Sequence, residues 1–298
     1  MKQLFVLTFC VVQYSASYAQ SVAPAVPTAP IPEHVGYSYF ALGIERFQYQ
    51  ESASTINVKS SVLVTNPVLM TGGLFNINER WDFSIDATSS LFAGASTERW
   101  DINSGQGIQF SNGTTLTSAN NPIQEIQFTE TRSSTQVLSH YKLSPAWRVL
   151  AGVDYSLSTF KRYGAKTNYP TVVTVPVGVV EESTGILDMD VGMQYQSSTN
   201  LSTPFRYLAA LTLNLPIYRK SINSNYTDIT FNSTSGWGIS ATTALSYKVY
   251  QKIHLGLYGG YDYRYLASQT KMSGTTSVEL PKNTTSHLIG GLTLVYDL

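Results

Sequence analysis

The sequence contains little charge. Lys, Arg, Asp and Glu make up 13% of its 298 residues, and the 19 basic and 19 acidic residues give a formal net charge of zero. This share of charged residues is about half that of an ordinary soluble domain. Without an excess of either sign, the chain has no general electrostatic attraction for nucleic acid or for an acidic membrane surface. We therefore expect no nucleic-acid partner.

Cysteine is nearly absent, and the single Cys10 lies in a segment with the features of a secretory signal peptide. The apolar run from Leu4 to Val12 is too short to cross a bilayer as a helix, and Ser17 and Ala19 take the −3 and −1 positions of a cleavage site. We predict that residues 1–19 are cleaved after Ala19; a short anchor helix is the alternative. Cleavage would remove the cysteine, which excludes disulfides, thiol catalysis and cysteine-bound metals from the mature chain.

Long hydrophobic runs are also missing. No stretch of 18 apolar residues follows residue 20, so we predict no transmembrane helix after the signal peptide. If the mature chain lies in a membrane, it must do so as a closed β-barrel, because only closure pairs the backbone groups of every strand. Residues 20–36 begin with "QSVAPAVPTAPIPEH", which predicts an extended periplasmic leader outside any sheet. The barrel itself is expected over residues 37–298.

From Tyr37 onward, apolar residues recur at every second position. In "WDFSIDATSSL" (81–91), Trp, Phe, Ile, Ala and Leu share one face while Asp, Ser and Thr share the other. This period of two predicts β-strands. We predict about ten, over 37–50, 56–77, 80–96, 122–143, 146–163, 185–199, 205–219, 236–249, 252–268 and 286–298. The segment 169–183 is either a strand-like excursion or an additional hairpin, which would make twelve.

The connections between these strands alternate between short and long. Four are tight, at 76–80, 142–147, 200–205 and 248–253. The others are mostly long and rich in Ser, Thr, Asn and Gly, as at 103–122 and 220–236. Short periplasmic turns and long extracellular loops are typical of an outer-membrane barrel. The pattern predicts a closed antiparallel up-and-down transmembrane β-barrel.

The apolar face could cover a protein core or contact lipid, since the strands of a secreted β-sandwich also alternate. The length of the segments favours lipid, because a tilted strand needs about ten residues to cross a bilayer. Aromatic residues also stand at the ends of the apolar face, as in the two interfacial girdles of a membrane barrel. The predicted girdle residues are Trp81, Trp147, Phe205, Tyr207, Tyr261, Tyr263 and Tyr265.

The C-terminal segment "HLIGGLTLVYDL" carries a resemblance to a known family. Leu292, Leu294, Tyr296 and Leu298 share one face, and the chain ends on a hydrophobic residue with an aromatic two positions before it. This resembles the C-terminal sorting signal of bacterial outer-membrane β-barrel proteins, although those proteins usually end in Phe or Trp. The resemblance implies a location in the outer membrane, contact with its lipid and lipopolysaccharide, and recognition of the last strand by the barrel-assembly machinery.

The polar face gathers the charged residues, which a barrel would turn toward its lumen. One possibility is that these charges neutralise one another in a plugged interior, because an unpaired buried charge is costly. The other is that they line a narrow water-filled path with charges of both signs. Mixed signs predict no strong ion selectivity. The candidate lumen-lining residues are Asp82, Asp86, Glu130, Arg132, His140, Arg148, Asp154, Asp188, Asp190, Arg206, His254, Asp262 and Arg264.

No pattern of residues points to covalent chemistry. The sequence has no GxxxxGK[ST], HExxH or GxSxG motif, and the spacing of its four histidines suggests no metal site. We therefore predict no metal, no cofactor and no catalytic residue. The glycine pair at 259–260 is read as close packing or a kink within a strand.

Omptins are ten-stranded outer-membrane proteases that use acidic residues and a histidine near the extracellular rim. Here Asp188 and Asp190 are expected near the outer end of their strand, but no Asp-x-His pair accompanies them. His254 follows a short turn at the opposite end, and only His287 is expected near the outer rim. An omptin-like protease is thus the least favoured function.

Two functions remain from the sequence. The first is a passive barrel, either a narrow channel for small polar solutes or ions or a barrel plugged by its own side chains. The alternative is an adhesin-like surface protein that acts through its long polar loops, which are also what variable solvent-exposed loops look like.

Overall fold

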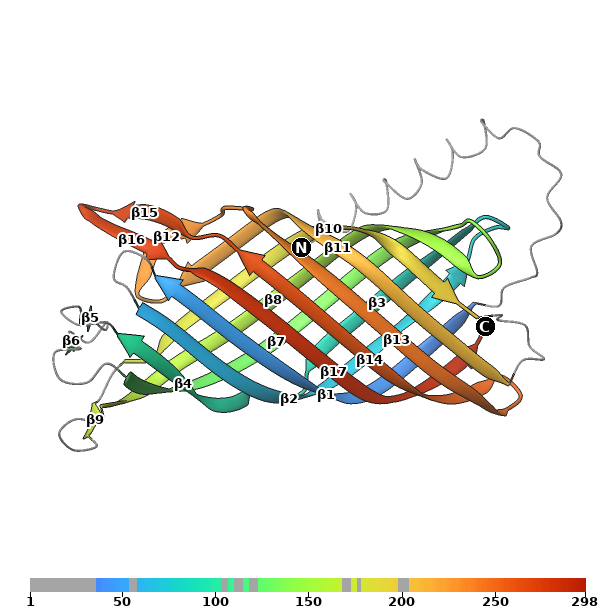
Figure 1. Ribbon diagram of the computed structural model, residues 1–298, viewed down its shortest axis with the longest axis horizontal. Coiled ribbons are helices and arrows are strands. Elements are labelled where there is room, and N and C mark those ends of the chain that lie inside the picture. Colours follow the sequence, from blue (N-terminus) through green and yellow to red (C-terminus); the bar gives the residue numbers. More distant parts are fainter. Residues whose placement is uncertain are drawn as a thin grey trace. The chain divides into compact units, whose positions relative to one another are not determined.

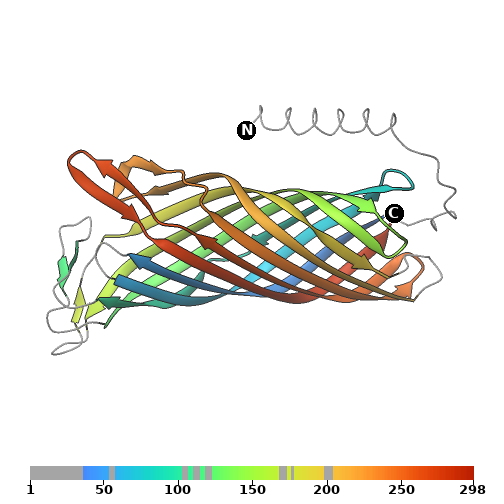
Figure 2. The ribbon, with the colours of Figure 1, turned by 45° about the horizontal axis from the view of Figure 1, so that its top comes forward.

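A computed structural model of the protein describes residues 36–53, 58–102, 107–109, 115–117, 123–167, 173–175, 178–197 and 204–298. These residues form a β-barrel in which strands wind obliquely around a long axis (Figures 1 and 2). Among them no helix is long and apolar enough to cross a membrane. The predicted signal peptide at 1–19 and most of the predicted leader at 20–36 lie outside the described residues. The wall consists of β1 (Tyr37–Ala53), β2 (Val58–Asn76), β3 (Trp81–Ser90), β4 (Gly94–Ile102), β7 (Ile123–Lys142), β8 (Trp147–Thr167), β10 (Val180–Gln196), β11 (Phe205–Asn223), β13 (Gly236–Tyr250), β14 (Ile253–Leu266) and β17 (Lys282–Asp297).

The barrel has ten wall positions because β3 and β4 share one of them. Both pair with β2 on one side and with β7 on the other, and the break between them falls at residues 91–93, opposite the stretch of β2 that contains Pro67. Every later strand is antiparallel to its neighbour, and β17 pairs with β1 from Tyr37↔Asp297 to Ser52↔Lys282. The last strand therefore closes the ring, and the prediction of a closed antiparallel barrel of about ten strands is confirmed.

Short turns gather at one end of the barrel, here called the turn end, and the longer connections gather at the other, the loop end. The β2–β3 turn is held by Asn78, whose side-chain oxygen accepts hydrogen bonds from the backbone N–H groups of Arg80 and Trp81, both at 2.9 Å. Ser144 does the same in the β7–β8 turn, with Trp147 N–H at 3.1 Å. Asn and Ser suit these positions because their short side chains bond the backbone two or three residues on.

The two faces of the wall are sorted as the alternation predicts. Large apolar side chains such as Leu257 and Leu292 point outward and are 59% and 69% exposed. Charged side chains such as Arg148 and Asp188 point inward and are fully buried. A water-soluble protein does not expose so continuous an apolar surface, so the outer face suits hydrocarbon. A β-sandwich, with two stacked sheets and an apolar interior, is not what the chain forms.

Additional strands extend the loop end. β12 (Tyr226–Phe231) pairs with β11, while β15 (Gln269–Ser273) and β16 (Thr276–Leu280) form a hairpin. Ile229, Phe231, Val278 and Leu280 pack together and join these two extensions. The remaining short strands are β5 (Gly107–Gln109), β6 (Thr115–Thr117) and β9 (Val173–Val175). β9 pairs only along the edge of β8, so residues 173–175 do not add a further wall hairpin and the alternative of twelve strands is wrong.

Candidate functional site in the barrel lumen

At the turn end, the inward charges form two separate clusters. On one side Asp82 forms an ion pair with Lys142, whose Nζ lies 2.8 Å from Oδ1, and accepts a hydrogen bond from Arg148 Nε at 3.2 Å. These residues lie on three neighbouring strands, β3, β7 and β8, within the first or last two residues of each strand. All three side chains are buried, so each charge depends on its partners.

The second turn-end cluster lies across the barrel. Arg206 of β11 donates two hydrogen bonds to the Asp297 carboxylate, and His254 Nε2 lies 3.1 Å from Asp297 Oδ2. The fork of a guanidinium group matches a carboxylate, which makes such pairs specific as well as strong. Asp297 is the penultimate residue of the chain, so this cluster also ties the closing strand to β11 and β14.

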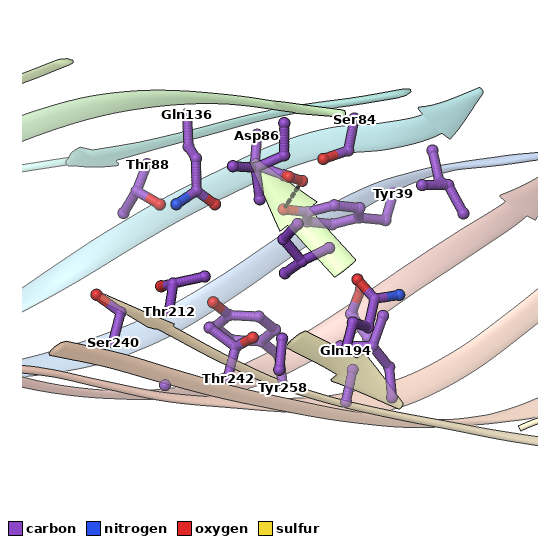
Figure 3. A pocket seen from close by; sticks show the side chains of 18 of the residues that line it. Tyr39, Ser84, Asp86, Thr88, Gln136, Gln194, Thr212, Ser240, Thr242 and Tyr258 are labelled. Carbon is purple, nitrogen blue, oxygen red and sulfur yellow. Dashed lines mark hydrogen bonds between the residues drawn. The ribbon is translucent and has the colours of Figure 1, made fainter. Parts of the chain in front are cut away.

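Between and above these clusters lies a cavity of about 220 Å³. Figure 3 shows its polar lining, with Asp86 and Gln136 on one wall and Thr242 and Tyr258 on the other. Tyr39 donates a hydrogen bond of 2.8 Å to Asp86 Oδ1 across Gly72, whose lack of a side chain leaves room for the tyrosine ring. The lining also includes residues of the turn end such as Arg206. Apolar side chains such as Leu138 and Leu150 complete the lining, and a cavity of this size has room for several water molecules.

Above the cavity is a layer of ion pairs and hydrogen bonds. Glu45 accepts from Arg132 Nη1 at 3.2 Å and lies 2.9 Å from His287 Nδ1. Arg264 donates to Asp188 and, at 3.1 Å, to Ser156 Oγ.

Asp190 stands next to this layer without a cationic partner within ion-pair distance in the described part of the chain. Two neutral donors serve it instead, Asn214 at 2.7 Å and Gln136 at 2.8 Å. Glu130 similarly accepts from Asn66, a buried neighbour. The carboxylates of this layer are therefore held by fixed partners that the fold brings together.

Nearest the loop end is an apolar layer, which consists of Phe47, Tyr49, Val62, Val64, Phe128 and Phe160. Its rings pack on one another, with centroids 5.4 Å apart for Phe128 and Phe160. Arg162 lies over the Phe160 ring at 4.9 Å and donates to Glu98 at 2.7 Å and to Glu51 at 3.2 Å. This aromatic layer places buried apolar side chains of β1, β2, β7 and β8 in the interior of the barrel.

Several of these contacts join side chains of strands that are not neighbours in the wall, and they therefore pass through the lumen. In a ring of ten wall positions, opposite strands are five positions apart. Arg162 to Glu51 and Arg264 to Ser156 each join strands four positions apart, and Arg132 to Glu45 joins strands three positions apart. Such contacts can form only across the interior, so side chains of the two layers nearer the loop end cross the lumen.

All the predicted lumen candidates stand on the inner face, but they serve different layers. Asp82, Arg148, Arg206 and His254 belong to the turn-end clusters. His140, also near the turn end, lies 2.9 Å from Ser84 Oγ. The cavity lining includes Asp86, Arg132, Asp154 and Asp262, and the layer above it holds Glu130, Asp188, Asp190 and Arg264.

The predicted positions of three residues need correction. Asp188 and Asp190 were expected near the outer end of their strand, but β10 begins at Val180, so both lie well inside the barrel. His287 was expected near the outer rim, but β17 begins at Lys282 and the ring is buried against Glu45 and Phe47. The error has one cause: the strands continue past the apolar membrane-crossing segment that the alternation of the sequence makes visible.

The main residues that sequence reasoning missed are those of the aromatic layer. In "ERFQYQE" (45–51), the inward positions read Glu, Phe, Tyr and Glu, so the aromatic rings share a face with carboxylates. That mixed face was a usable signal. Rings between acids on the inner face of a barrel indicate a packed interior, not a second lipid contact.

The predicted girdle lies on the outer wall. At the turn end, Trp81 packs on Tyr141, Trp147 on Tyr195, and Phe205 on Tyr247, with centroids 4.8 to 5.3 Å apart. Tyr207 packs on Tyr195 and continues this band. Toward the loop end, Tyr263 of β14 packs on Trp237 of β13, and β14 also carries Tyr261 and Tyr265. The side chains of Leu292, Leu294, Tyr296 and Leu298 are exposed on the outer face of the closing strand.

The described residues contain no group of three His, Cys, Asp or Glu side chains that could hold a metal ion. No family model matches the sequence, and no curated protein matches it. Among solved structures, the barrel is similar to the outer membrane protease OmpT from Escherichia coli. The TM-score is 0.67 at 10% identity, covering 92% of this chain and 100% of that one.

Two further matches are weaker. The translocator domain of the autotransporter NalP from Neisseria meningitidis covers 90% of this chain and 91% of its own at 10% identity, with a TM-score of 0.36. Ail, the attachment invasion locus protein of Yersinia pestis, covers 88% of this chain and 99% of its own at 8% identity, with a TM-score of 0.29. Of these three matches, the one to OmpT is close enough in shape to support a comparison of folds.

The chain therefore has the fold of the bacterial outer-membrane β-barrel proteins. At 10% identity, the likeness to OmpT is one of fold alone. The fold predicted from the C-terminal segment and the alternation is thus confirmed.

Proposed function

We propose that this protein is an outer-membrane barrel closed by its own side chains, and that it does not provide an open path for solutes. The observation that carries the proposal is the pair of layers that cross the lumen above the cavity. In the layer of ion pairs, Arg132 would have to separate from Glu45, and Arg264 from Asp188, for a solute to pass. In the aromatic layer above it, the apolar side chains pack on one another. Breaking a buried pair is costly because it leaves a charge uncompensated.

Conductance in planar bilayers tests this function. We expect the refolded full chain to insert without regular open-channel steps. A variant that opens both layers, with Phe47, Phe128, Phe160, Arg132 and Arg264 all changed to alanine, should gain conductance, whereas emptying the aromatic layer alone should not. Phe40→Ala is the matched control, because Phe40 lies on the outer face of β1. Discrete conductance steps from the unchanged protein would disprove the closed barrel.

A second candidate is surface interaction, because the loop end carries an ordered platform. The β15–β16 hairpin is fastened to β12 through the small apolar cluster and through Lys271 Nζ, which donates to the Thr230 carbonyl oxygen at 2.6 Å. Ser273 Oγ also donates to Asp228 at 2.8 Å. A platform of fixed shape suits recognition, because its residues lose little freedom on binding.

Replacement of residues 268–281 by an Asn-Gly turn tests the surface-interaction function. The turn can join two antiparallel strands directly, so β14 and β17 should still pair and the barrel should still fold. Cells that display the shortened protein should lose adhesion to immobilised matrix proteins that cells displaying the full protein bind. Equal adhesion, or none in either case, would remove support for this candidate.

Proteolysis has less support. Of the four histidines, His140 and His254 lie near the turn end, His287 is buried in the middle of the barrel, and His34 lies outside the described residues. Asp188 and Asp190 are occupied by Arg264, Asn214 and Gln136. No described histidine therefore stands beside an exposed acidic pair at the loop end.

A further inference from the structure

Asp154 differs from the other carboxylates of the lumen. It lines the cavity, is 7% exposed, and its Oδ1 accepts no hydrogen bond from the part of the chain that the structure describes. It also stands directly opposite Asp188 in the pairing of β8 with β10. Like charges directly opposite on one face of a sheet repel each other. The side chain is thus buried and repelled by its neighbour, and the described residues give its Oδ1 no donor.

The nearby cations do not resolve this imbalance. Arg132 and Arg264 attract Asp154 at longer range, but their guanidinium groups contact Glu45 and Asp188. Asp262, another cavity carboxylate, accepts from the Ser240 hydroxyl at 2.7 Å and leaves Oδ1 without a donor. The cavity therefore has two carboxylate oxygens without a described donor. Its lining also carries three carboxylates, Asp86, Asp154 and Asp262, against two guanidinium groups, Arg132 and Arg206.

We propose that the cavity binds a small aliphatic amine, with an ammonium group on Asp154. The described residues offer no cluster of ligands for a metal ion. An ammonium group is a donor that needs no such cluster. The donor-free oxygens of Asp154 and Asp262, on strands four wall positions apart, suit the two ammonium groups of a short diamine. The alkyl part would lie along Tyr39, Tyr258 and Leu150, which also line the cavity. The faces of aromatic rings attract a cation, and the rings also pack against alkyl groups.

The geometry also gives the side of entry. The cavity lining includes Tyr37, Gln196 and Arg206 at the turn end, while the ion-pair layer and the aromatic layer stand between the cavity and the loop end. An amine would therefore enter from the turn end, which faces the periplasm in a barrel of this class. Binding of this kind goes beyond the closed barrel and does not require passage through it.

Isothermal titration of the refolded full chain with putrescine, in detergent micelles at low salt, tests the proposal. We expect saturable binding to the unchanged protein and at least tenfold weaker binding to Asp154→Asn, which corresponds to about 1.4 kcal/mol. Asp101→Asn is the control, since Asp101 is exposed on the outer face of β4 and should leave affinity unchanged. The neutral analogue 1,4-butanediol should not bind.

A second variant guards against a folding defect in Asp154→Asn. Thr242→Trp fills the cavity from β13 and leaves every carboxylate in place, so it should abolish putrescine binding while the barrel keeps its β-sheet spectrum. The proposal is overturned if the unchanged protein shows no saturable binding. It is also overturned if a folded Asp154→Asn or Thr242→Trp binds putrescine as tightly as the unchanged protein.

Discussion

Replacing Arg162 with alanine is expected to lower the free energy of unfolding by about 3–5 kcal/mol. Its side chain is 7% exposed and pairs with Glu98, which is fully buried, and with Glu51 across the lumen. Removal of the guanidinium group would leave both carboxylates in the interior with their charge uncompensated. Denaturant unfolding of the refolded barrel in micelles, followed by tryptophan fluorescence, measures the change.

The neighbouring residue supplies the control for this prediction. Lys161 pairs with Glu181 at 2.9 Å, but the two side chains are 50% and 44% exposed. Water screens an exposed pair, so Lys161→Ala should cost no more than about 1 kcal/mol. Equal losses for the two variants would show that Arg162 does not hold the interior together. Arg162→Lys should recover only part of the stability, because an ammonium group cannot reproduce the fork that contacts both oxygens of Glu98.

Phe128→Ala is expected to cost about 3–5 kcal/mol, for a different reason. Phe128 is fully buried and its ring packs on Tyr49 and Phe160. Loss of the ring leaves a cavity within the aromatic layer, and the rigid strands on either side cannot close it. The same unfolding measurement reports the change.

Phe128→Leu should cost clearly less than Phe128→Ala, since leucine fills most of the space. Phe92 is the control, because it is 71% exposed at the break between β3 and β4 and has little packing to lose. A loss for Phe128→Ala no larger than that for Phe92→Ala would mean that the aromatic layer is loosely packed.

The strands and their faces were predictable because the information is local. Alternation such as that of residues 81–91 places each side chain inward or outward without reference to the rest of the chain. The same local rule predicted that Asp82, Arg148 and Asp188 share the inner face. What the alternation could not give was where each strand ends, because beyond the membrane the outer face no longer needs to be apolar. Hence Asp188 and His287 were placed too near the rim.

The sequence by itself determined that the chain forms a closed barrel with an apolar outer face and a charged inner face. The alternation of apolar and polar residues and the lengths of the turns suffice for that. Only the tertiary structure decided which inward groups meet. Arg162 and Glu51 stand 111 positions apart in the chain, and Asp297 reaches Arg206 over 91. These partners depend on the tilt of the strands and the register at closure, which combine small offsets from every strand of the ring. The layers that cross the lumen, and the unpartnered Asp154 beneath them, therefore become visible only once the ring is closed.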